Sequence, residues 1–343
     1  MSSPSEKICI IGTGSWGTTL AVVFARRGLN VSLWARTPEE AALLNARREN
    51  VDFLPGIPFP LTVHVTHALA SAARDARILI VVVPSQTFRA NVRQVRPFIA
   101  AHQIVVSATK GIEIEGLQRM SEILRDELPQ IPPEQFVVVS GPNIAREIAA
   151  GLPASTVAAA ADEAVAREAQ ERLMSPSFRI YTHTDVVGVE LAGALKNVYA
   201  IAAGAADTLN VGENAKATVL TRALAEMTRL GVALGANPIT FAGLAGIGDL
   251  MCTCNSRHSR NHTVGERLAQ GQKLDEILAG MKMVAEGINT AKAARQLALR
   301  HHVEMPLVEQ VYAVLFEGKS PRQAIGDLMG RGAKAEFYGI GDA

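Results

Sequence analysis

The stretch "KICIIGTGSWG" most strongly constrains what this chain can fold into. A β-branched run ends at Gly12, and Gly12, Gly14 and Gly17 follow in G-x-G-x-x-G spacing before an expected helix, Trp16–Arg27. In this context the first glycine permits a tight turn, the second lets the backbone approach a pyrophosphate, and the third lets the helix pack on the strand. The helix N-terminus then offers N–H groups and a positive dipole end to phosphate oxygens. The stretch therefore predicts the phosphate-binding turn of a dinucleotide-binding βαβ unit.

Short apolar runs alternate with amphipathic stretches up to about Tyr181. Several of these runs are continuous and β-branched, as expected of strands that are covered on both faces. Alternation of strands and helices implies a mostly parallel sheet with right-handed crossovers. The expected strands are Lys7–Ile11, Asn30–Trp34, Thr62–Val65, Arg77–Val83, Gln103–Ala108, Gln135–Ser140, Ser155–Ala160 and Phe178–Tyr181.

Beyond Tyr181 the alternation stops and helical patterns take over. The chain has 343 residues, which is enough for two domains. We therefore predict an α/β fold, with a Rossmann-like, mostly parallel sheet domain over residues 1–185 and an all-helical domain over residues 186–343. The helices expected in the second domain are Val186–Ala206, Ala215–Leu234, Ile239–Leu244, Thr263–Gln270, Leu274–Ala279, Gly287–His301, Leu307–Glu317 and Pro321–Met329.

Composition excludes several classes of partner. The 34 basic and 33 acidic side chains leave a net charge of +1, which does not favour nucleic acid or a membrane surface. Aromatic residues make up 5%, too few for base-stacking platforms. Three cysteines are an odd, low count that fits a reducing compartment, and the polar start "MSSPSEK" lacks the apolar core of a signal peptide. We expect a cytoplasmic protein.

An ammonium group stands inside the apolar, small-residue run Val186–Ala206, at Lys196 beside Asn197. The run has about the ~20 residues of a membrane span, but Glu190, Lys196 and Asn197 interrupt it. We therefore expect a closely packed helix and no membrane span. A buried ammonium must find a partner, reach water or lose its proton. Lys196 is accordingly either a structural lysine that snorkels out of the helix or an acid/base group whose pKa is lowered by burial.

The end of the second expected strand bears on cofactor choice. An acid that binds the ribose 2′-hydroxyl is usual there in NAD sites, but this chain has Arg36, which can meet the 2′-phosphate of NADP. Glu39 and Glu40 follow closely and could still reach a 2′-hydroxyl. We expect NADP(H) or NAD(H) as cofactor. Since ligands bind beyond the carboxyl ends of such strands, Lys110 in "SATKG" is expected near the cofactor.

A second polar cluster lies in residues 243–265, which we expect to form a loop before a short helix. Arginine offers a planar donor fork for phosphate, and serine and asparagine add neutral donors, so the cluster predicts a site for a phosphate-bearing substrate. A polar surface loop is the alternative. No metal site is expected, because Cys252, Cys254, His258 and His262 do not have the usual zinc spacing. The polar residues of the cluster are Asp249, Thr253, Asn255, Ser259, Arg260, Asn261 and His262.

Along nearly its whole length the chain resembles the bacterial NAD(P)-dependent glycerol-3-phosphate dehydrogenases. The resemblance implies a Rossmann-like domain joined to a helical domain, and usually a homodimer. It also implies interconversion of sn-glycerol 3-phosphate and dihydroxyacetone phosphate, mainly to supply phospholipid synthesis. The matching stretches are "GTGSWGTTLA", "FLPGIPFP", "VVVPS", "ATKGIE", "SGPNIAREIAAGLP", "GALKNVYAIAAG", "GLAGIGDLMCTC", "SRN" and "VAEGINT".

The same resemblance implies roles for individual residues. Lys196 is similar to the proton acceptor, Lys110 to the lysine that touches both cofactor and substrate, and Asp249 joins them in the catalytic group. Many family members carry Ser or Thr where this chain has Asn143. Implied cofactor contacts are Gly12, Gly14, Ser15, Trp16, Gly17, Arg36, Lys110, Ala145, Arg260, Val284 and Glu286. Implied substrate contacts are Lys110, Gly141, Asn143, Lys196, Asp249, Ser259, Arg260 and Asn261.

Two other functions fit part of the pattern. A related 3-hydroxyacid dehydrogenase would act on a carboxylate with a Rossmann domain, a helical domain and a helix-borne lysine. An NADP-binding sensor without chemistry would need the glycine turn but not Lys110, Lys196 and Asp249.

Overall fold

The structure, a computed structural model, describes residues 7–336 and 338–339 of the chain. The chain divides into two compact units. The sheet unit comprises the chain up to Thr109 together with Met120–Val186, and the helical unit comprises Lys110–Arg119 together with the chain from Val187 onward. A short excursion from the first half of the chain therefore belongs to the helical unit.

The sheet unit is built on eight strands in the order β3-β2-β1-β4-β5-β6-β7-β8. All neighbouring strands pair in parallel except β6 and β7, which are antiparallel, so the expected mostly parallel sheet is confirmed. The chain runs from β1 out to β3 and returns to β4 beside β1, as in dinucleotide-binding sheets. The strands are β1 Lys7–Ile11, β2 Asn30–Trp34, β3 Val63–Thr66, β4 Ile78–Val81, β5 Ile104–Ser107, β6 Phe136–Ser140, β7 Ala154–Ala160 and β8 Phe178–His183.

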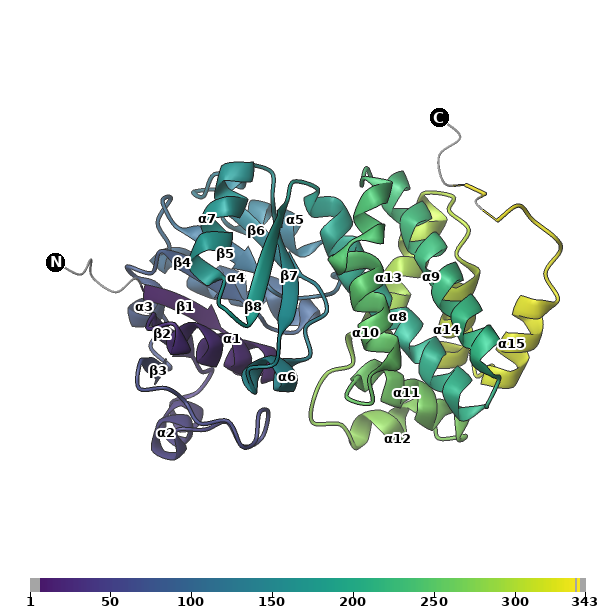
Figure 1. The fold of residues 1–343 in the computed structure, drawn as a ribbon, viewed down its shortest axis with the longest axis horizontal. Coiled ribbons are helices and arrows are strands. Elements are labelled where there is room, and N and C mark those ends of the chain that lie inside the picture. Colours follow the sequence, from purple (N-terminus) through teal and green to yellow (C-terminus); the bar gives the residue numbers. More distant parts are fainter. Residues whose placement is uncertain (1–6, 337, 340–343) are drawn as a thin grey trace. The chain divides into compact units, whose positions relative to one another are not determined.

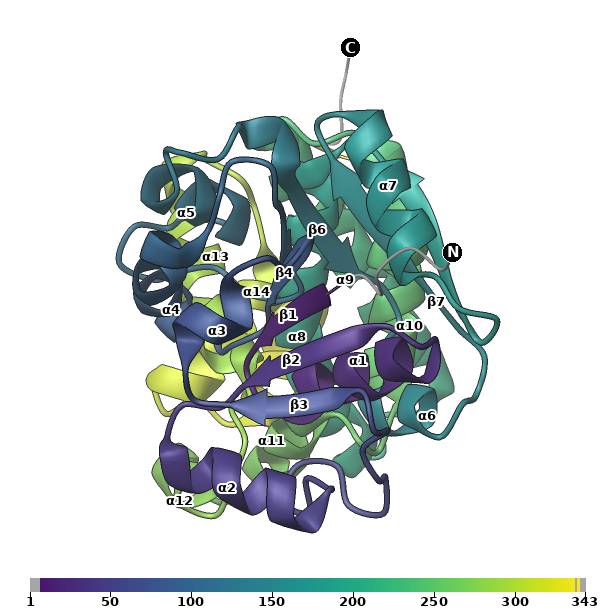
Figure 2. The ribbon, with the colours of Figure 1, turned by 90° about the vertical axis from the view of Figure 1, so that its left-hand side faces the viewer.

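Helices cover both faces of this sheet (Figure 2). Side chains alternate along each strand, so Ile8 and Ile10 of β1 enter one apolar core while Cys9 and Ile11 enter the other. Burial on both faces explains why the strands read as continuous apolar runs. One face carries α1 (Ser15–Arg26), α6 (Ala145–Ala149) and α7 (Glu163–Leu173), and the other carries α3 (Leu69–Ala73), α4 (Phe88–Val95) and α5 (Met120–Glu127). Helix α2 (Pro38–Arg47) packs beside β3.

The helical unit includes the long helix α8, Val186–Thr208 (Figure 1). The side chains of α8 are mostly buried. Glycines let α8 touch its neighbour α11 closely, because a Cβ at Gly204 would lie 2.0 Å from the carbonyl oxygen of His262 and one at Gly265 would lie 1.9 Å from that of Ile201. The other helices are α9 Glu213–Ala233, α10 Asp249–Asn255, α11 Arg260–Ala269, α12 Leu274–Ala279, α13 Glu286–Arg300, α14 Pro306–Phe316 and α15 Pro321–Met329.

By length and composition alone, α8 qualifies as a membrane-crossing helix. However, 83% of its most apolar stretch is buried inside the protein. Its carboxylate Glu190 is also buried and forms an ion pair with Arg119 at 2.6 Å. These features are those of a core helix, as its sequence indicated.

The polar cluster at residues 243–265 is not the expected loop. It forms a π-helical turn at Leu244–Gly248, then α10, then α11, which begins at Arg260 rather than at Thr263. The Ser259 side chain caps α11 by accepting a hydrogen bond from the His262 backbone N–H. The expected helix Ile239–Leu244 is instead a 3₁₀ turn, Pro238–Ala242. The small, glycine-rich run "GLAGIG" has little apolar periodicity, which hid the helical character of this segment.

Candidate active site

The glycine turn after β1 has the geometry that a pyrophosphate requires. Gly12 has a φ of +122°, and a Cβ there would lie 2.4 Å from the carbonyl oxygen of Val82. A Cβ at Gly17 would lie 2.1 Å from the Gly12 oxygen, so this position needs glycine for close packing. A Cβ at Gly14 would meet no atom within 4 Å, so the backbone there is open to a ligand. The turn and the start of α1 therefore fit a dinucleotide phosphate.

Three other expected cofactor contacts lie near this turn or on a helix that packs against α1. Ser15 is the first residue of α1 and donates its hydroxyl hydrogen to the carbonyl oxygen of Phe53. The Trp16 ring packs edge-on against Phe178, with 6.1 Å between ring centroids. Ala145 begins α6, which packs against α1. The side chains of Ser15 and Trp16 are thus engaged within the sheet unit, which leaves the backbone of the first turn to face a phosphate.

A carboxylate lies between the glycine turn and the end of β2. Glu40 accepts a hydrogen bond from the hydroxyl of Thr13 inside the turn and another, at 3.1 Å, from the backbone N–H of Arg36. Thr37 caps α2 and accepts from the Glu40 backbone N–H. The Arg36 side chain is exposed. An acid and an arginine therefore share the place where Rossmann folds bind the adenosine ribose, and the acid comes from the first turn of α2 rather than from the strand end.

Gly141 and Asn143 follow β6. A Cβ at Gly141 would lie 2.9 Å from the Cα of Thr156, so the two segments touch closely. Thr156 also donates its hydroxyl hydrogen to Oδ1 of Asn143 at 3.0 Å. The Nδ2 atom of Asn143 is buried, and no partner for it exists among the described residues. A buried donor without a partner costs about 1–3 kcal/mol, so an acceptor on a ligand would complete this site.

Within the helical unit, Lys110, Lys196 and Asp249 meet in one buried group. Asp249 is 1% exposed, and its two carboxylate oxygens each hold one lysine. Nζ of Lys110 lies 2.5 Å from Oδ2, and Nζ of Lys196 lies 2.8 Å from Oδ1. Lys196 also donates to the hydroxyl of Thr253 at 2.6 Å. We call these three charged residues and Thr253 the lysine–aspartate cluster. Lys196 therefore finds a partner inside the protein and does not snorkel to water.

The charges in this cluster shift the pKa values of its members. Burial lowers the pKa of Lys110 from 10.5 to about 8, and the charge of Lys196 adds to this effect while Asp249 opposes it. Burial on its own would raise the pKa of Asp249, but the charges of Lys110 and Lys196 outweigh it and lower that pKa. With every member ionised, two ammonium groups and one carboxylate leave a net positive charge. The cluster suits an anion or an oxygen on which negative charge develops.

The excursion Lys110–Arg119 brings Lys110 into the helical unit. Ile112 and Arg119 form an antiparallel bridge that closes this excursion into a loop. The ion pair between Arg119 and Glu190 ties the end of the loop to α8, while the ion pair between Lys110 and Asp249 ties its start to α10. Two ion pairs therefore hold Lys110 in place, and they also account for the charge at Glu190.

Two asparagines hold α8, α11 and α13 together beside the cluster. Asn261 donates from Nδ2 to Oδ1 of Asn197 at 2.9 Å, and Oδ1 of Asn261 accepts from the backbone N–H of Gly287 at 2.9 Å. A Cβ at Gly287 would lie 2.4 Å from the Asn197 carbonyl oxygen, so the contact requires glycine. Asn261 thus uses its oxygen and one amide hydrogen to join these helices.

The remaining expected contacts lie around the start of α11. The exposed Arg260 donates from Nη1 to the carbonyl oxygen of Val284 at 2.7 Å, and Glu286 is the first residue of α13. A small cavity of 190 Å³ beside Arg260 has Arg267 and Lys282 among its lining residues. The start of α11 therefore borders a cationic hollow of a size that suits a phosphate group.

Sequence reasoning missed two residues of this site. Thr253 stood in the polar cluster but had no assigned role, because α10 was not foreseen and its proximity to Asp249, one helical turn away, was therefore hidden. Asn197 was noticed only as a neighbour of Lys196. An Asx residue inside an apolar helix is a signal of a buried polar network, and that signal was available.

The glycine turn of the sheet unit and the buried, net-positive lysine–aspartate cluster of the helical unit are each typical of an NAD(P)-dependent oxidoreductase acting on a CH–OH group. Comparison with known proteins gives the family. Residues 7–166 match the family model described as the NAD-dependent glycerol-3-phosphate dehydrogenase N-terminus, and residues 185–326 match the one described as its C-terminus. The chain belongs to this family.

Individual relatives match this chain along almost its whole length. The chain is 51% identical to glycerol-3-phosphate dehydrogenase [NAD(P)+] of Citrifermentans bemidjiense, over 97% of this chain and 99% of the relative. It is 50% identical to that of Geobacter sulfurreducens, over 97% and 100%. The crystal structure of glycerol-3-phosphate dehydrogenase from Coxiella burnetii superposes with a TM-score of 0.91 at 37% identity, covering 96% of this chain and 100% of that one. The 3-hydroxyacid alternative is not favoured by these matches.

Proposed function

We propose that this chain interconverts dihydroxyacetone phosphate and sn-glycerol 3-phosphate with NAD(P)H or NAD(P)+, and that its product supplies glycerophospholipid synthesis. The observation that carries this proposal is the buried lysine–aspartate cluster in a chain of the glycerol-3-phosphate dehydrogenase family. A sensor that only binds dinucleotide would have no use for two lysines around one buried carboxylate.

Reduction of a ketone needs a hydride at the carbonyl carbon and a proton at the carbonyl oxygen. A reduced nicotinamide, when bound, would supply the hydride. We assign the proton to Lys196, whose ammonium is oriented by Asp249 and by the hydroxyl of Thr253. In the oxidation direction the same amine takes the proton from the substrate hydroxyl. A positioned acid/base group contributes roughly 10²–10⁴ in rate.

Lys110 has a different part in this proposal. Its ammonium contacts the other oxygen of Asp249 and supplies the second positive charge of the cluster. Positive charge fixed in place stabilises the oxygen on which negative charge develops in the transition state. Since its pKa lies at about 8, Lys110 loses this charge just above neutral pH, and the rate of reduction should decline there.

We propose that the start of α11 binds the phosphate of the substrate. Arg260 offers a guanidinium fork, Ser259 and Asn261 flank it, and Lys282 and Arg267 border the same small cavity. The remaining amide hydrogen of Asn261 and the unpartnered Nδ2 of Asn143 are donors that this proposal also gives to substrate. Gly141 completes the set by allowing the close approach after β6.

We propose the cofactor contacts from the glycine motif and from the resemblance to the family. Gly12, Gly14, Ser15, Trp16 and Gly17 would hold the pyrophosphate and Arg36 the adenosine ribose. Lys110, Ala145, Arg260, Val284 and Glu286 are the further contacts of this proposal. In the same way we propose residues 1–185 as the cofactor domain, residues 186–343 as the substrate domain, a homodimer in solution and a cytoplasmic location.

A single assay tests the function. The purified chain is mixed with NADPH or NADH and with dihydroxyacetone phosphate, and loss of reduced nicotinamide is followed by absorbance. We expect turnover with dihydroxyacetone phosphate and little with a 3-keto acid such as acetoacetate. Faster turnover of the keto acid would replace the proposal by the carboxylate alternative, and cofactor binding without any turnover would reduce the chain to a sensor.

A further inference from the structure

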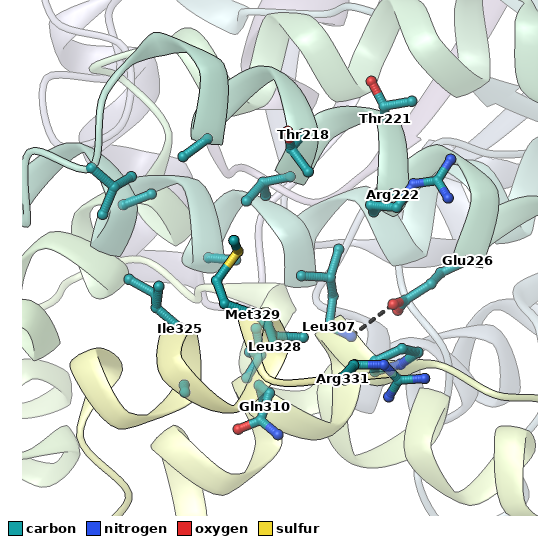
Figure 3. Close-up of a pocket in the computed structure, with 18 of the residues that line it drawn as sticks. Thr218, Thr221, Arg222, Glu226, Leu307, Gln310, Ile325, Leu328, Met329 and Arg331 are labelled. Atoms are coloured by element: carbon teal, nitrogen blue, oxygen red, sulfur yellow. Dashed lines mark hydrogen bonds between the residues drawn. The ribbon is translucent and has the colours of Figure 1, made fainter. Parts of the chain in front are cut away.

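The helical unit contains a large cavity of about 1040 Å³, apart from the residues assigned to the reaction. Its walls come from α8, α9, α14 and α15 (Figure 3). Most of the lining is alkyl, contributed by Ile201 and Ala205 of α8, Val311 of α14, and Ile325 and Leu328 of α15. The volume is at the upper end of the range for pockets that hold small organic ligands.

One end of this cavity is polar. In Figure 3, Arg222, Glu226 and Arg331 gather at one end, while Ile325 and Met329 lie toward the other. Glu226 is 1% exposed and its Oε1 accepts a hydrogen bond from the backbone N–H of Leu307 at 2.7 Å. Burial raises the pKa of Glu226 to about 7, so this carboxyl is partly neutral at physiological pH. An incoming anion therefore meets less repulsion here than a fully ionised glutamate would give.

Positive charge exceeds negative charge at this polar end. The basic lining residues are Arg222, Arg229, Arg331 and Lys334. Arg331 and Lys334 share the single carboxylate of Glu304, at 3.3 and 2.5 Å, so one anion serves two cations. Arg222 lies 3.7 Å from the Glu336 carboxylate and also donates from Nη1 to the Glu336 carbonyl oxygen at 2.9 Å, which uses part of its donor fork. The cavity thus joins a long alkyl surface to a cationic end.

We propose that this cavity binds a single-chain anionic amphiphile, namely a long-chain fatty acid, with its hydrocarbon chain among α8, α9, α14 and α15. Its carboxylate contacts Arg222 and Arg331. A small polar metabolite would leave the alkyl walls without contacts, and a neutral hydrocarbon would leave the cationic end without an anion. A free carboxylate on an unbranched chain satisfies both ends, which is why we commit to this occupant.

Chain length gives the first test. The full-length protein is titrated by calorimetry with decanoate, dodecanoate and tetradecanoate below their micelle concentrations. Each buried methylene is worth ~0.8 kcal/mol, so each added carbon should tighten binding about four-fold. Dodecanol should bind about ten-fold or more weakly than dodecanoate, because a charged hydrogen-bond pair is lost. Equal affinity for all three acids, or for the acid and the alcohol, overturns the proposal.

Matched variants locate the site. Thr218 lines the cavity from α9 and is exposed, so Thr218→Trp should fill the cavity and abolish dodecanoate binding. Glu213→Trp is the control, because it places the same ring on the same helix but outside the lining, and it should leave dodecanoate binding unchanged. The double variant Arg222→Gln/Arg331→Gln should weaken dodecanoate about ten-fold or more, whereas Arg300→Gln, an exposed arginine outside the lining, should have no effect. Thermal unfolding curves confirm that each variant is folded.

Four further outcomes would overturn the proposal. Dodecanoate affinity that survives Thr218→Trp places the ligand elsewhere. Displacement of dodecanoate by saturating NADPH and dihydroxyacetone phosphate places it in the reaction site. If Thr218→Trp dissociates an oligomer whose wild-type form binds no dodecanoate, a second copy of the chain covers the cavity instead. Stronger binding to phosphatidylglycerol vesicles than to free dodecanoate would likewise replace the free acid by a membrane surface.

Discussion

Replacing Asp249 by asparagine is the most informative perturbation of the site. The carboxylate is 1% exposed and is the common partner of Lys110 and Lys196 in the lysine–aspartate cluster. Asp249→Asn keeps the size of the side chain and removes its charge. Two buried ammonium groups would then face each other with only neutral acceptors between them.

The expected cost follows from the burial of both lysines, whose side chains are 17% and 8% exposed. Removing one partner of a buried ion pair costs about 3–5 kcal/mol, because the remaining charge is left uncompensated. Here one carboxylate serves two lysines, so we expect the upper part of that range. This loss is a large share of the ~5–15 kcal/mol that holds a typical domain folded.

The stability that Asp249→Asn loses should become smaller as pH rises. In the wild type, burial lowers the pKa of Lys110 to about 8, below its ordinary 10.5, so the unfolded chain binds this proton more tightly. Stability therefore rises with pH between about 8 and 10.5. Asp249 raises the pKa of Lys110, so in Asp249→Asn the pKa of Lys110 in the folded protein must fall below 8. The stability of the variant should therefore begin to rise at a lower pH than that of the wild type. The deficit of the variant should be largest near pH 6–7 and should shrink as pH rises.

Urea unfolding of the helical signal at several pH values between 6 and 9.5 measures this deficit. Asp275→Asn is the matched control, since Asp275 is an exposed aspartate on α12 in the same unit. We also expect kcat of Asp249→Asn to fall ~100-fold or more, because Lys196 loses the group that orients it. A variant as stable as the control at pH 6.5, or a deficit that grows with pH, would refute the charge argument.

Three further predictions concern the reaction. Lys196→Met should keep the fold and NADPH affinity yet lose ~10²–10⁴ in kcat, and wild-type turnover would make Lys196 structural. Arg36→Asp should lower kcat/KM for NADPH far more than for NADH, and Glu40→Gln should shift kcat/KM in favour of NADPH. Equal changes for both cofactors would contradict the assignment of these residues to the adenosine ribose. Arg260→Ala should raise KM for dihydroxyacetone phosphate roughly 10- to 150-fold, whereas the exposed neighbour Arg257 can be changed to alanine freely, and an unchanged KM would remove Arg260 from the phosphate site.

The fold of the sheet unit was readable from sequence because most of its strands are buried on both faces, while the edge strands β3 and β8 alternate buried and exposed residues. Runs such as Lys7–Ile11 and Asn30–Trp34 begin and end in the structure where their apolar, β-branched pattern begins and ends. The antiparallel pairing of β6 with β7 was not readable, because both run as continuous apolar segments and strand direction leaves no mark on such a pattern.

The candidate site was less readable, because its contacts join residues far apart in the chain. Lys110 and Asp249 were each noticed, but their separation in sequence exceeds any local pattern. Glu40 was considered for the ribose, yet only the structure shows that Thr13 and Arg36 hold its carboxylate. The helix at Asp249–Asn255 escaped notice because the glycines before it resemble a loop, and Thr253 escaped with it.

The small residues of α8 allow the close helix contacts that keep water away from the lysine–aspartate cluster. Glycine at 204 and 265 brings α8 and α11 into backbone contact, and Gly287 does the same where α13 meets Asn197. Such close contact excludes water from the middle of α8. In this dry setting a single carboxylate acts strongly on two ammonium groups, whereas in water the same pairs would contribute little. The Ala- and Gly-rich composition of α8 is therefore part of the chemistry, because larger side chains would separate the helices and let water weaken the hold of Asp249 on Lys196.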